Sequence, residues 1–346
     1  TTLAEYLKDF SYYTAGFFIN PVLKVGKGFE QGFDYYSGDW IGTPKMTARV
    51  IDFLNNYRGN KPLFIWIHYI DPHAPYLPPE DYFKIFDNDK LYKKDDKILE
   101  LAPEYISNIF TSRGYIPKIV FQKNKYNLNY YIACYDAEIR YTDFYIGELL
   151  KNIKDNTLII LSADHGESLG KHSVYFCHEG NIYDELLHIP LIIKDNRDFK
   201  GGKRISTVIS SIDIVPTILS RVNPVWYFFN KNKFDGINLK RIVNGKNIKR
   251  KYIYSYFPWA RSIRDVNKNI KYILNDNGSE ELYFLPDEHN NYINDKSFEV
   301  ACIKEELRKE LKTWYKDYPV QADINPKKIF LDEQGKDSLR SLGYLQ

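Results

Sequence analysis

Sulfur-containing residues are scarce in this chain of 346 residues, which has three cysteines and one methionine. Cys134, Cys177 and Cys302 share no C-x-x-C spacing, and their odd number argues against a disulfide framework. So few thiols suit a reducing compartment without assigning one. The scarcity therefore excludes the disulfide-stabilised scaffolds as a class.

Excess charge and long apolar runs are also missing. The 48 basic and 45 acidic side chains leave a formal net charge of +3, which gives no reason to expect nucleic acid or a membrane surface as a partner. No apolar run reaches the roughly 18 residues of a membrane-spanning helix. With 44% hydrophobic and 27% charged residues, the composition is that of an ordinary globular protein with one large domain, or a large and a small one.

A methionine is missing at the first position, where the chain reads Thr1-Thr2-Leu3 in a helical pattern, and the one methionine is Met46. A natural translation product would not begin in this way. We therefore expect that the natural N-terminal part precedes the sequence given.

Short apolar strand patterns alternate with helical patterns over the first 250 residues. Strands are expected near residues 12–19, 62–70, 157–163 and 188–193, and helices near 2–10, 43–58, 127–153 and 211–221. Thr43 is the expected N-cap of the second helix, with Pro44 at its first position. The helix near 127–153 has apolar residues at helical spacing that include Ile132, Ile139 and Leu149. The alternation predicts an α/β fold with a mixed, mostly parallel sheet flanked by helices.

The pattern changes after about residue 250. Short strands follow one another near residues 252–257, 270–274 and 282–284, and an amphipathic helix covers about 298–315. We expect a main domain at residues 1–250 and a C-terminal subdomain at 251–346, built from a small antiparallel sheet, a helix and a tail.

Histidines gather in the loops that follow the predicted strands. Five of the seven lie there: His68, His73, His165, His172 and His178. Ligands of open α/β sheets bind at the carboxyl ends of the strands, so these loops are the candidate site. His68 lies within an apolar strand, and we expect it and His172 to be structural.

Asp164 and His165 are adjacent at the end of a predicted strand, and Gly166 allows a sharp turn there. Carboxylate and imidazole together suit a divalent metal, although two residues are too few for a complete site. A polar turn after a buried strand is the alternative interpretation.

His73 lies between Pro72 and Pro75, which stiffen its loop, so its imidazole has a defined position from which to bind an anion or transfer a proton. His178 precedes Gly180 in another loop. For both, a purely structural role stays open. Cys134 and Cys302 are expected to be core residues. Cys177 beside His178 is a weak candidate nucleophile, because adjacent residues of an extended chain point to opposite sides.

These residues stand within segments that resemble, in order, motifs of the sulfatases of the alkaline phosphatase superfamily. Gly32-Phe33-Asp34 resembles the family's GFD, Phe64–Pro79 its PHxPY loop, and Asn156–Gly170 its metal-binding strand end. The remaining matches are Tyr135–Ile139 with Ile146–Leu150, His178–Leu191, Glu281–Asn291 and Leu339–Tyr344, which resembles LRxLGY.

The resemblance implies roles for particular residues. Asp164 and His165 match the second pair of metal ligands, usually for Ca²⁺, with Mn²⁺, Mg²⁺ or Zn²⁺ as alternatives. His73 matches a histidine that contacts the sulfate group or the leaving oxygen, and His178 falls where the family places a Lys or His near the sulfate. The implied substrate is a small-molecule or glycan sulfate ester.

The chain departs from the family pattern at three places. The family's nucleophile is a formylglycine made within C/S-x-P-x-R, and that motif is absent here, as is the upstream Asp-Asp pair. Both precede the segment resembling residues 1–19, so we expect the sequence to begin downstream of the nucleophile. Phe18-Ile19-Asn20-Pro21 stands where many members carry G-K-W-H.

We therefore expect a metal-dependent hydrolase of sulfate monoesters, with residues 1–346 inactive by themselves. Two alternatives remain within the superfamily: a phosphodiester or phosphonate monoester hydrolase, and a phosphoethanolamine-type transferase. A third is an inactive family member that acts as a binding protein. The sequence leaves the compartment and the oligomeric state open.

Overall fold

A computed structural model describes residues 1–39, 41–93, 97–103, 114–178, 180–199, 201–246 and 250–317. The described residues form two compact units, one from residues 1–157 and 219–228, the other from 158–218 and 229–317. The expected division at residue 250 stays a prediction. The segment Leu339–Tyr344, and with it most of the expected tail, lies outside the described residues.

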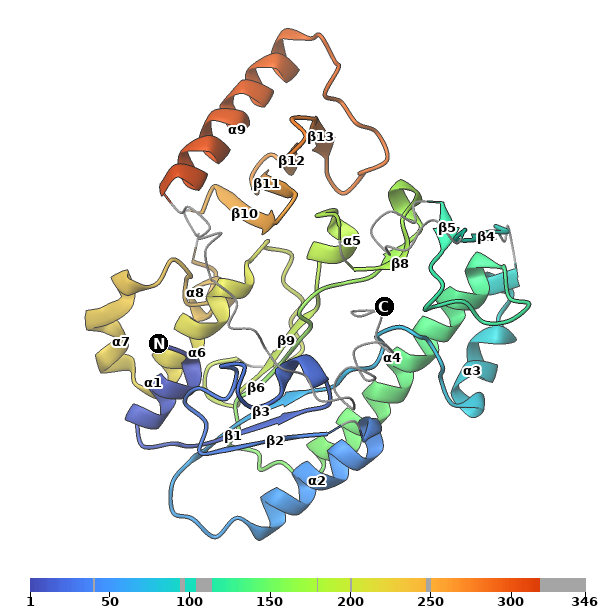
Figure 1. Cartoon of the computed structure of the whole chain (residues 1–346). Coiled ribbons are helices and arrows are strands. Elements are labelled where there is room, and N and C mark those ends of the chain that lie inside the picture. The colour runs from blue at the N-terminus through green and yellow to red at the C-terminus, as the bar shows by residue number, and fades with distance from the viewer. Residues whose placement is uncertain are drawn as a thin grey trace. The chain divides into compact units, whose positions relative to one another are not determined.

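The first unit is built on a parallel sheet of three strands in the order β2-β1-β3. Helix α2 packs on this sheet, as Figure 1 shows, and the core between them contains Phe17, Met46 and Val50. The elements of this unit are α1 (Leu3–Asp9), β1 (Tyr13–Phe18), β2 (Tyr35–Gly38), α2 (Gly42–Asn56), β3 (Leu63–His68), α3 (Glu80–Asp87), β4 (Glu100–Leu101), β5 (Tyr115–Ile116) and α4 (Leu128–Leu150).

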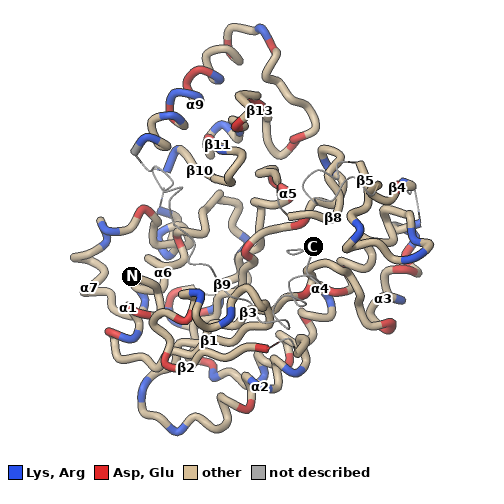
Figure 2. Tube along the Cα trace, viewed as in Figure 1, with Lys and Arg blue, Asp and Glu red and all other residues tan. Residues whose placement is uncertain are grey.

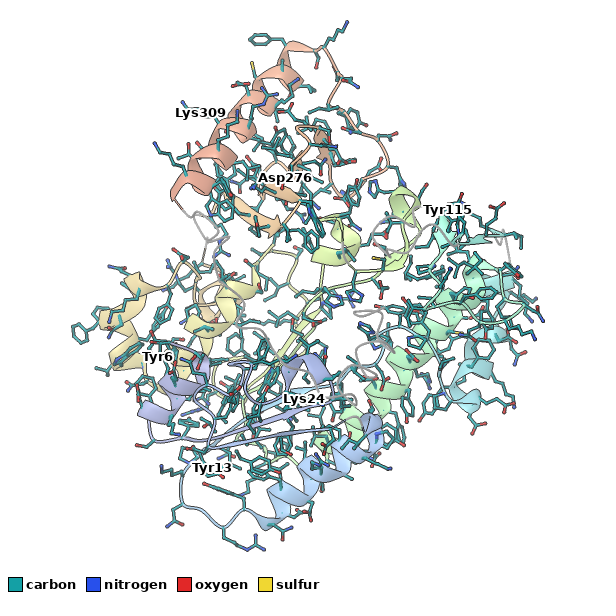
Figure 3. All side chains as sticks on the ribbon, viewed as in Figure 1. Tyr6, Tyr13, Lys24, Tyr115, Asp276 and Lys309 are labelled. Atoms are coloured by element: carbon teal, nitrogen blue, oxygen red, sulfur yellow. The ribbon has the colours of Figure 1, made fainter. Side chains whose placement is uncertain are left out.

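Aromatic side chains fill much of this core, which accounts for part of the high tyrosine content. Tyr13, labelled in Figure 3 near the start of β1, lies with its ring centroid 5.3 Å from that of Tyr57. Phe17 lies edge-to-face against Phe53 at 5.3 Å. Such aromatic contacts between β1 and α2 determine the position of the helix along the strands.

The second unit contains the antiparallel pair β6 and β9 and a four-stranded antiparallel sheet in the order β10-β11-β12-β13. Helix α9 packs on that sheet through Val300, Ile303, Leu307 and Leu311. The opposite side of α9 carries alternating basic and acidic residues (Figure 2). This arrangement confirms the predicted small C-terminal antiparallel sheet with a helix.

The elements of the second unit follow the same chain order. They are β6 (Ile159–Ser162), β7 (Ser168–Leu169), β8 (Tyr175–Cys177), α5 (Asp184–Leu187), β9 (Leu191–Lys194), α8 (Lys240–Val243), β10 (Tyr252–Phe257), β11 (Ala260–Asp265), β12 (Ile270–Asn275), β13 (Glu280–Phe284) and α9 (Phe298–Asp317). The residues of α6 (Ile214–Val222) and α7 (Pro224–Asn230) are divided between the two units.

Three expectations about individual residues are wrong. Thr43 is not a helix cap, because α2 has Ile41 at its N-cap position, and the Thr43 hydroxyl donates to Asp71 instead. Ile139 is exposed, since α4 buries Tyr131, Cys134, Glu138 and Thr142. Cys302 is exposed, because α9 contacts its sheet through the opposite side of the helix.

In the part of the chain that the structure describes, no helix is both long enough and apolar enough to cross a bilayer.

Candidate functional site

The first unit carries one group of candidate residues at the carboxyl end of β3. The chain leaves β3 at His68 and forms a tight turn in which the His73 amide donates to Ile70 O at 2.9 Å. Asp71 anchors this turn by accepting a hydrogen bond from Thr43 Oγ1 at 2.5 Å. Burial raises the pKa of Asp71, and the hydrogen bond from Thr43 opposes that rise. The residues after β3 are thus held by the start of α2.

His73 itself has a defined tautomer in this loop. Its Nδ1 lies 2.7 Å from Ala74 O, and a carbonyl can only accept, so Nδ1 carries the proton. Nε2 is then the nitrogen that can accept a proton or, in the imidazolium form, donate one. The contact with Ala74 thus fixes which nitrogen of His73 can exchange a proton.

The loop that carries His73 also packs against helix α4 and the residues before it. The Leu77 amide donates to Glu138 Oε1 at 2.7 Å, and Gln122 Nε2 donates to Tyr76 O at 2.7 Å. The Tyr76 ring lies edge-to-face against Tyr135, with centroids 5.6 Å apart. These contacts make the loop a fixed element rather than a free surface turn.

The second unit carries the other group, which follows β6. Asp164 is exposed, with 68% of its side chain accessible, and its Oδ1 accepts from the His165 amide at 3.0 Å. His165 Nδ1 lies 2.8 Å from Gly166 O, so Nδ1 is protonated and Nε2 has the lone pair. That Nε2 lies 3.8 Å from Asp164 Oδ1. One oxygen and one nitrogen ligand therefore face each other, as they would around a shared cation.

The structure places His178 against this pair. The rings of His165 and His178 are stacked with centroids 4.2 Å apart, and only 12% of the His178 side chain is exposed. His178 Nδ1 lies 3.5 Å from Oε2 of the buried Glu167. The imidazole of His178 and the carboxylate of Glu167 thus form a close and largely buried pair.

Helix α5 supports the turn after Asp164 and His165. The Gly166 amide donates to Leu186 O at 2.8 Å, and a Cβ at Gly166 would lie 1.9 Å from Glu185 O. The Glu185 carboxylate accepts from the Leu169 amide at 3.2 Å, and burial raises its pKa to about 7. Only glycine fits where the turn meets α5.

The donor set for a metal is half complete in the described residues. Asp164 and His165 have the atoms and the spacing of two ligands, and the hydrogen bond at His165 Nδ1 is the usual second contact of a metal-binding histidine. Among the described residues, no group of three or more His, Cys, Asp or Glu side chains is arranged to hold an ion. The pair fits a divalent cation but needs further ligands.

The remaining candidates behave as structural residues. Cys134 is buried, and burial raises the pKa of its thiol to about 12, while Cys177 is buried on β8. His172 stacks on Tyr183 with centroids 3.5 Å apart, and burial lowers its pKa to about 4. A buried neutral histidine in an aromatic stack is typical of a core residue.

Three acidic residues near the candidates were not singled out from sequence: Asp71, Glu138 and Glu167. The signal for Glu138 lies in its spacing, since it falls four residues after Cys134 and four before Thr142, on the face that α4 buries. An acidic residue within a buried helical stripe is worth attention because burying a carboxylate is costly.

Comparison with known proteins gives one family. The sulfatase family model matches residues 2–224. The chain is 26% identical over 287 residues to an arylsulfatase of Clostridium perfringens, covering 75% of this chain and 56% of that protein. It is 24% identical over 301 residues to a sulfatase of Formosa agariphila, covering 80% of this chain and 57% of the relative. The chain thus spans little more than half the length of these relatives.

Solved structures of similar fold include two with different ligands or activities. One, in complex with its substrate D-glucosamine-2-N,6-O-disulfate, has a TM-score of 0.68 and 22% identity over 95% of this chain and 84% of its own. A phosphonate monoester hydrolase of Agrobacterium radiobacter has a TM-score of 0.68 and 18% identity over 92% of this chain and 80% of its own. At these identities the likeness concerns the fold.

Proposed function

The chain belongs to the sulfatase family of the alkaline phosphatase superfamily, and on that premise we propose that it provides binding and proton-transfer groups for hydrolysis of sulfate monoesters. The observation that carries the proposal is the arrangement around His165: a carboxylate at its edge and a second imidazole on its face. Cationic or metal-bound groups in such a cluster suit an ester that carries negative charge on its nonbridging oxygens.

Asp164 and His165 would hold a divalent cation, most simply Ca²⁺, with Mn²⁺, Mg²⁺ or Zn²⁺ as alternatives, together with ligands from outside this set. When bound, the cation would neutralise charge that develops on the sulfate oxygens. Asp164 keeps an exposed carboxylate for this purpose, and the bond from His165 Nδ1 to Gly166 O holds Nε2 toward Asp164.

His178 and His73 would serve the ester itself. His178 lies with Nδ1 beside the buried carboxylate of Glu167, and its ring would donate a hydrogen bond to a sulfate oxygen. His73 has Nδ1 engaged by Ala74 O, so Nε2 is the atom from which a proton would pass to the leaving alkoxide. The nucleophile in this proposal is a formylglycine supplied from outside residues 1–346.

The substrate is proposed to be a sulfate ester of a small molecule or a glycan. This part of the proposal is supported by the family and by the fold likeness to a protein that binds a glucosamine disulfate. Phosphodiesters and phosphonate monoesters are the competing class, since a hydrolase of phosphonate monoesters has a similar fold. An inactive, ligand-binding member is the remaining alternative.

A direct assay separates these classes. The full-length gene product is incubated with 4-nitrophenyl sulfate, with bis(4-nitrophenyl) phosphate and with a phenylphosphonate monoester, with and without chelator. The proposal expects the highest kcat/KM on the sulfate, lost on chelation and in a His73→Ala variant. Faster turnover of either phosphorus ester would overturn the substrate class, and no turnover of any of them would favour the binding protein.

A further inference from the structure

The loop that carries His73 is fastened at both ends. At its start, Asp71 is held by Thr43, and the Thr142 hydroxyl of α4 lies 3.5 Å from Asp71 O. At its end, the Leu77 amide donates to Glu138 on α4 at 2.7 Å. The position of His73 therefore depends on one face of α4, through Glu138 and Thr142.

Glu138 is unusual on this face because only one of its two carboxyl oxygens has a hydrogen-bond partner among the described residues. The residue is only 4% exposed. Oε1 accepts from Leu77, whereas Oε2 is buried and has no hydrogen-bond partner among the described residues. Burying an ionised carboxylate without a cation costs much free energy, whereas burying the protonated carboxyl group costs far less.

The charges around Glu138 also disfavour its ionisation. Burial, followed by the nearby Asp71 carboxyl, raises the pKa of Glu138 to about 9, and the Leu77 amide opposes this only in part. No cation acts on this carboxyl in the described part of the chain. The two acids form a coupled pair in which a second negative charge is unfavourable.

Three of the other titratable groups around the pair have raised pKa values and are therefore uncharged near neutral pH. Burial raises the pKa of Cys134 and Tyr141 to about 12 each, and it raises that of Tyr69. The groups around the pair are, from α4, Cys134, Tyr135 and Tyr141, from the end of β3, Tyr69, and from the loop itself, His73 and Tyr76, with Lys125 acting on Cys134.

We propose that Glu138 is a positioning residue that acts through its uncharged carboxyl group, holding the His73 loop against helix α4. The inference rests on the role proposed for His73 and adds a residue that acts on the reaction through His73. The loop opens when Glu138 reaches water and loses its proton. Opening is therefore coupled to proton release, and it becomes easier as the pH rises toward the pKa of the buried group.

Hydrogen exchange tests this coupling without an activity assay. The exchange of the peptide Asp71–Pro79, corrected for the intrinsic rate, is compared at about pH 6 and pH 8 in the full-length wild type and in Glu138→Gln. Since glutamine cannot ionise, the wild-type protection should fall by about tenfold for each pH unit, or about 100-fold over this range, while that of Glu138→Gln stays constant. Glu148→Gln, on the exposed side of α4, is the matched control and should follow the wild type.

A comparison of Glu138→Ala with Glu138→Gln tests whether the hydrogen bond to Leu77 holds the loop. Glu138→Ala, where it folds, should lose about tenfold in protection at pH 6, because the Leu77 amide loses its acceptor, whereas glutamine restores it. Equal protection of the wild type at both pH values, or the same fall in Glu138→Gln, would overturn the proposal.

Activity gives the second readout. With 4-nitrophenyl sulfate, Glu138→Gln should keep kcat/KM within about twofold of the wild type at pH 6, and its kcat should fall less on the alkaline side. If the wild type hydrolyses no sulfate ester, the proposed function fails while the exchange result still decides the role of Glu138. If hydrolysis occurs and Glu138→Gln has the wild-type alkaline fall, the positioning role is wrong.

Discussion

The imidazole rings of His165 and His178 lie stacked, with centroids 4.2 Å apart and planes inclined by 14°. The two residues belong to different loops, one after β6 and one after β8, so their contact is a product of the fold. The contact leaves the edge of His165, with Nε2, directed toward Asp164. The proposed metal ligands and the proposed substrate-binding histidine are thereby brought into one cluster.

The first prediction concerns metal content. Asp164→Ala removes one of the two ligands, and the full-length variant should retain less than about a fifth of the wild-type metal after dialysis. Elemental analysis measures this directly. Asp9→Ala, an exposed change in α1, is the control and should leave the content unchanged. Unchanged metal in the Asp164 variant would remove Asp164 from the site.

The second prediction separates the stacking of His178 from its chemistry. His178→Phe keeps an aromatic ring against His165, whereas His178→Ala does not. Both should lower kcat/KM for a sulfate ester by about 100-fold or more, because neither can donate a proton or hydrogen bond. Only the alanine variant should also show a lowered melting temperature. Wild-type activity in the phenylalanine variant would show that His178 is structural.

The third prediction concerns the turn after His165. A Cβ at Gly166 would lie 1.9 Å from Glu185 O, so Gly166→Ala forces the backbone of the turn or of α5 to move. We expect a loss of about 2 kcal/mol or more in the free energy of unfolding, and weaker metal binding. Urea denaturation and metal titration measure the two effects.

Gly147→Ala is the matched control for that experiment. Gly147 lies within α4, and a Cβ there would meet nothing within 4 Å. Because alanine favours the helix, this change should raise the free energy of unfolding by roughly 0.5–1 kcal/mol. A destabilised Gly147 variant together with an unaffected Gly166 variant would contradict the described packing.

Much of the fold follows from local sequence patterns. The first helix α1, the parallel strands β1 and β3 and the long helices α4 and α9 are where periodicity predicts them. Helix α3 was not predicted, although its apolar and charged residues lie on different sides of the helix.

The side-chain partners could not be predicted in the same way. Thr43 has the sequence of a helix cap, yet its hydroxyl bonds Asp71, which is distant in sequence. On α4, Glu138 is buried and Ile139 is exposed. The reason is the loop that packs there, because its Leu77 amide needs a hydrogen-bond acceptor. The sequence predicted Asp164 and His165 as a pair, and His178 and His73 as separate candidates. The stack of His165 on His178 is a tertiary contact that no local pattern encodes.

The fourth prediction is a pH dependence of stability that arises from His172. Burial lowers the pKa of His172 from 6.5 to about 4, so the unfolded chain binds a proton there at a higher pH than the folded chain. Stability therefore falls as the pH drops from 6.5 to about 4. Since the side chain is partly accessible, we expect an effect of the order of 1 kcal/mol.

Urea denaturation at pH 7 and pH 5 checks this prediction. His172→Phe can keep the stack on Tyr183, which lies 3.5 Å away in the wild type, but has no proton to bind. Its midpoint should change less between the two pH values than that of the wild type. The same change in both proteins would assign the pH dependence to other groups.

The last prediction links the C-terminal sheet to the turn that carries Asp164 and His165. Lys271 on β12 is buried, and its ammonium lies 2.8 Å from Glu288 Oε1 and 2.9 Å from Asp184 Oδ1 at the start of α5. Helix α5 in turn accepts the Gly166 amide through Leu186 O. The ammonium of Lys271 in the C-terminal sheet thus holds the helix on which the turn of Asp164 and His165 rests.

Lys271→Met should therefore lower the free energy of unfolding by more than the loss of an exposed ion pair does. It leaves the buried Glu288 without its cation, and we expect a loss of about 3–5 kcal/mol in the free energy of unfolding, with weaker metal binding in whatever folds. Lys251→Met breaks an exposed pair with Glu306 and should cost less than about 1 kcal/mol. Equal losses for the two variants would show that Lys271 contributes no more than a surface charge. A large loss with unchanged metal affinity in the folded fraction would show that α5 keeps its position without Lys271.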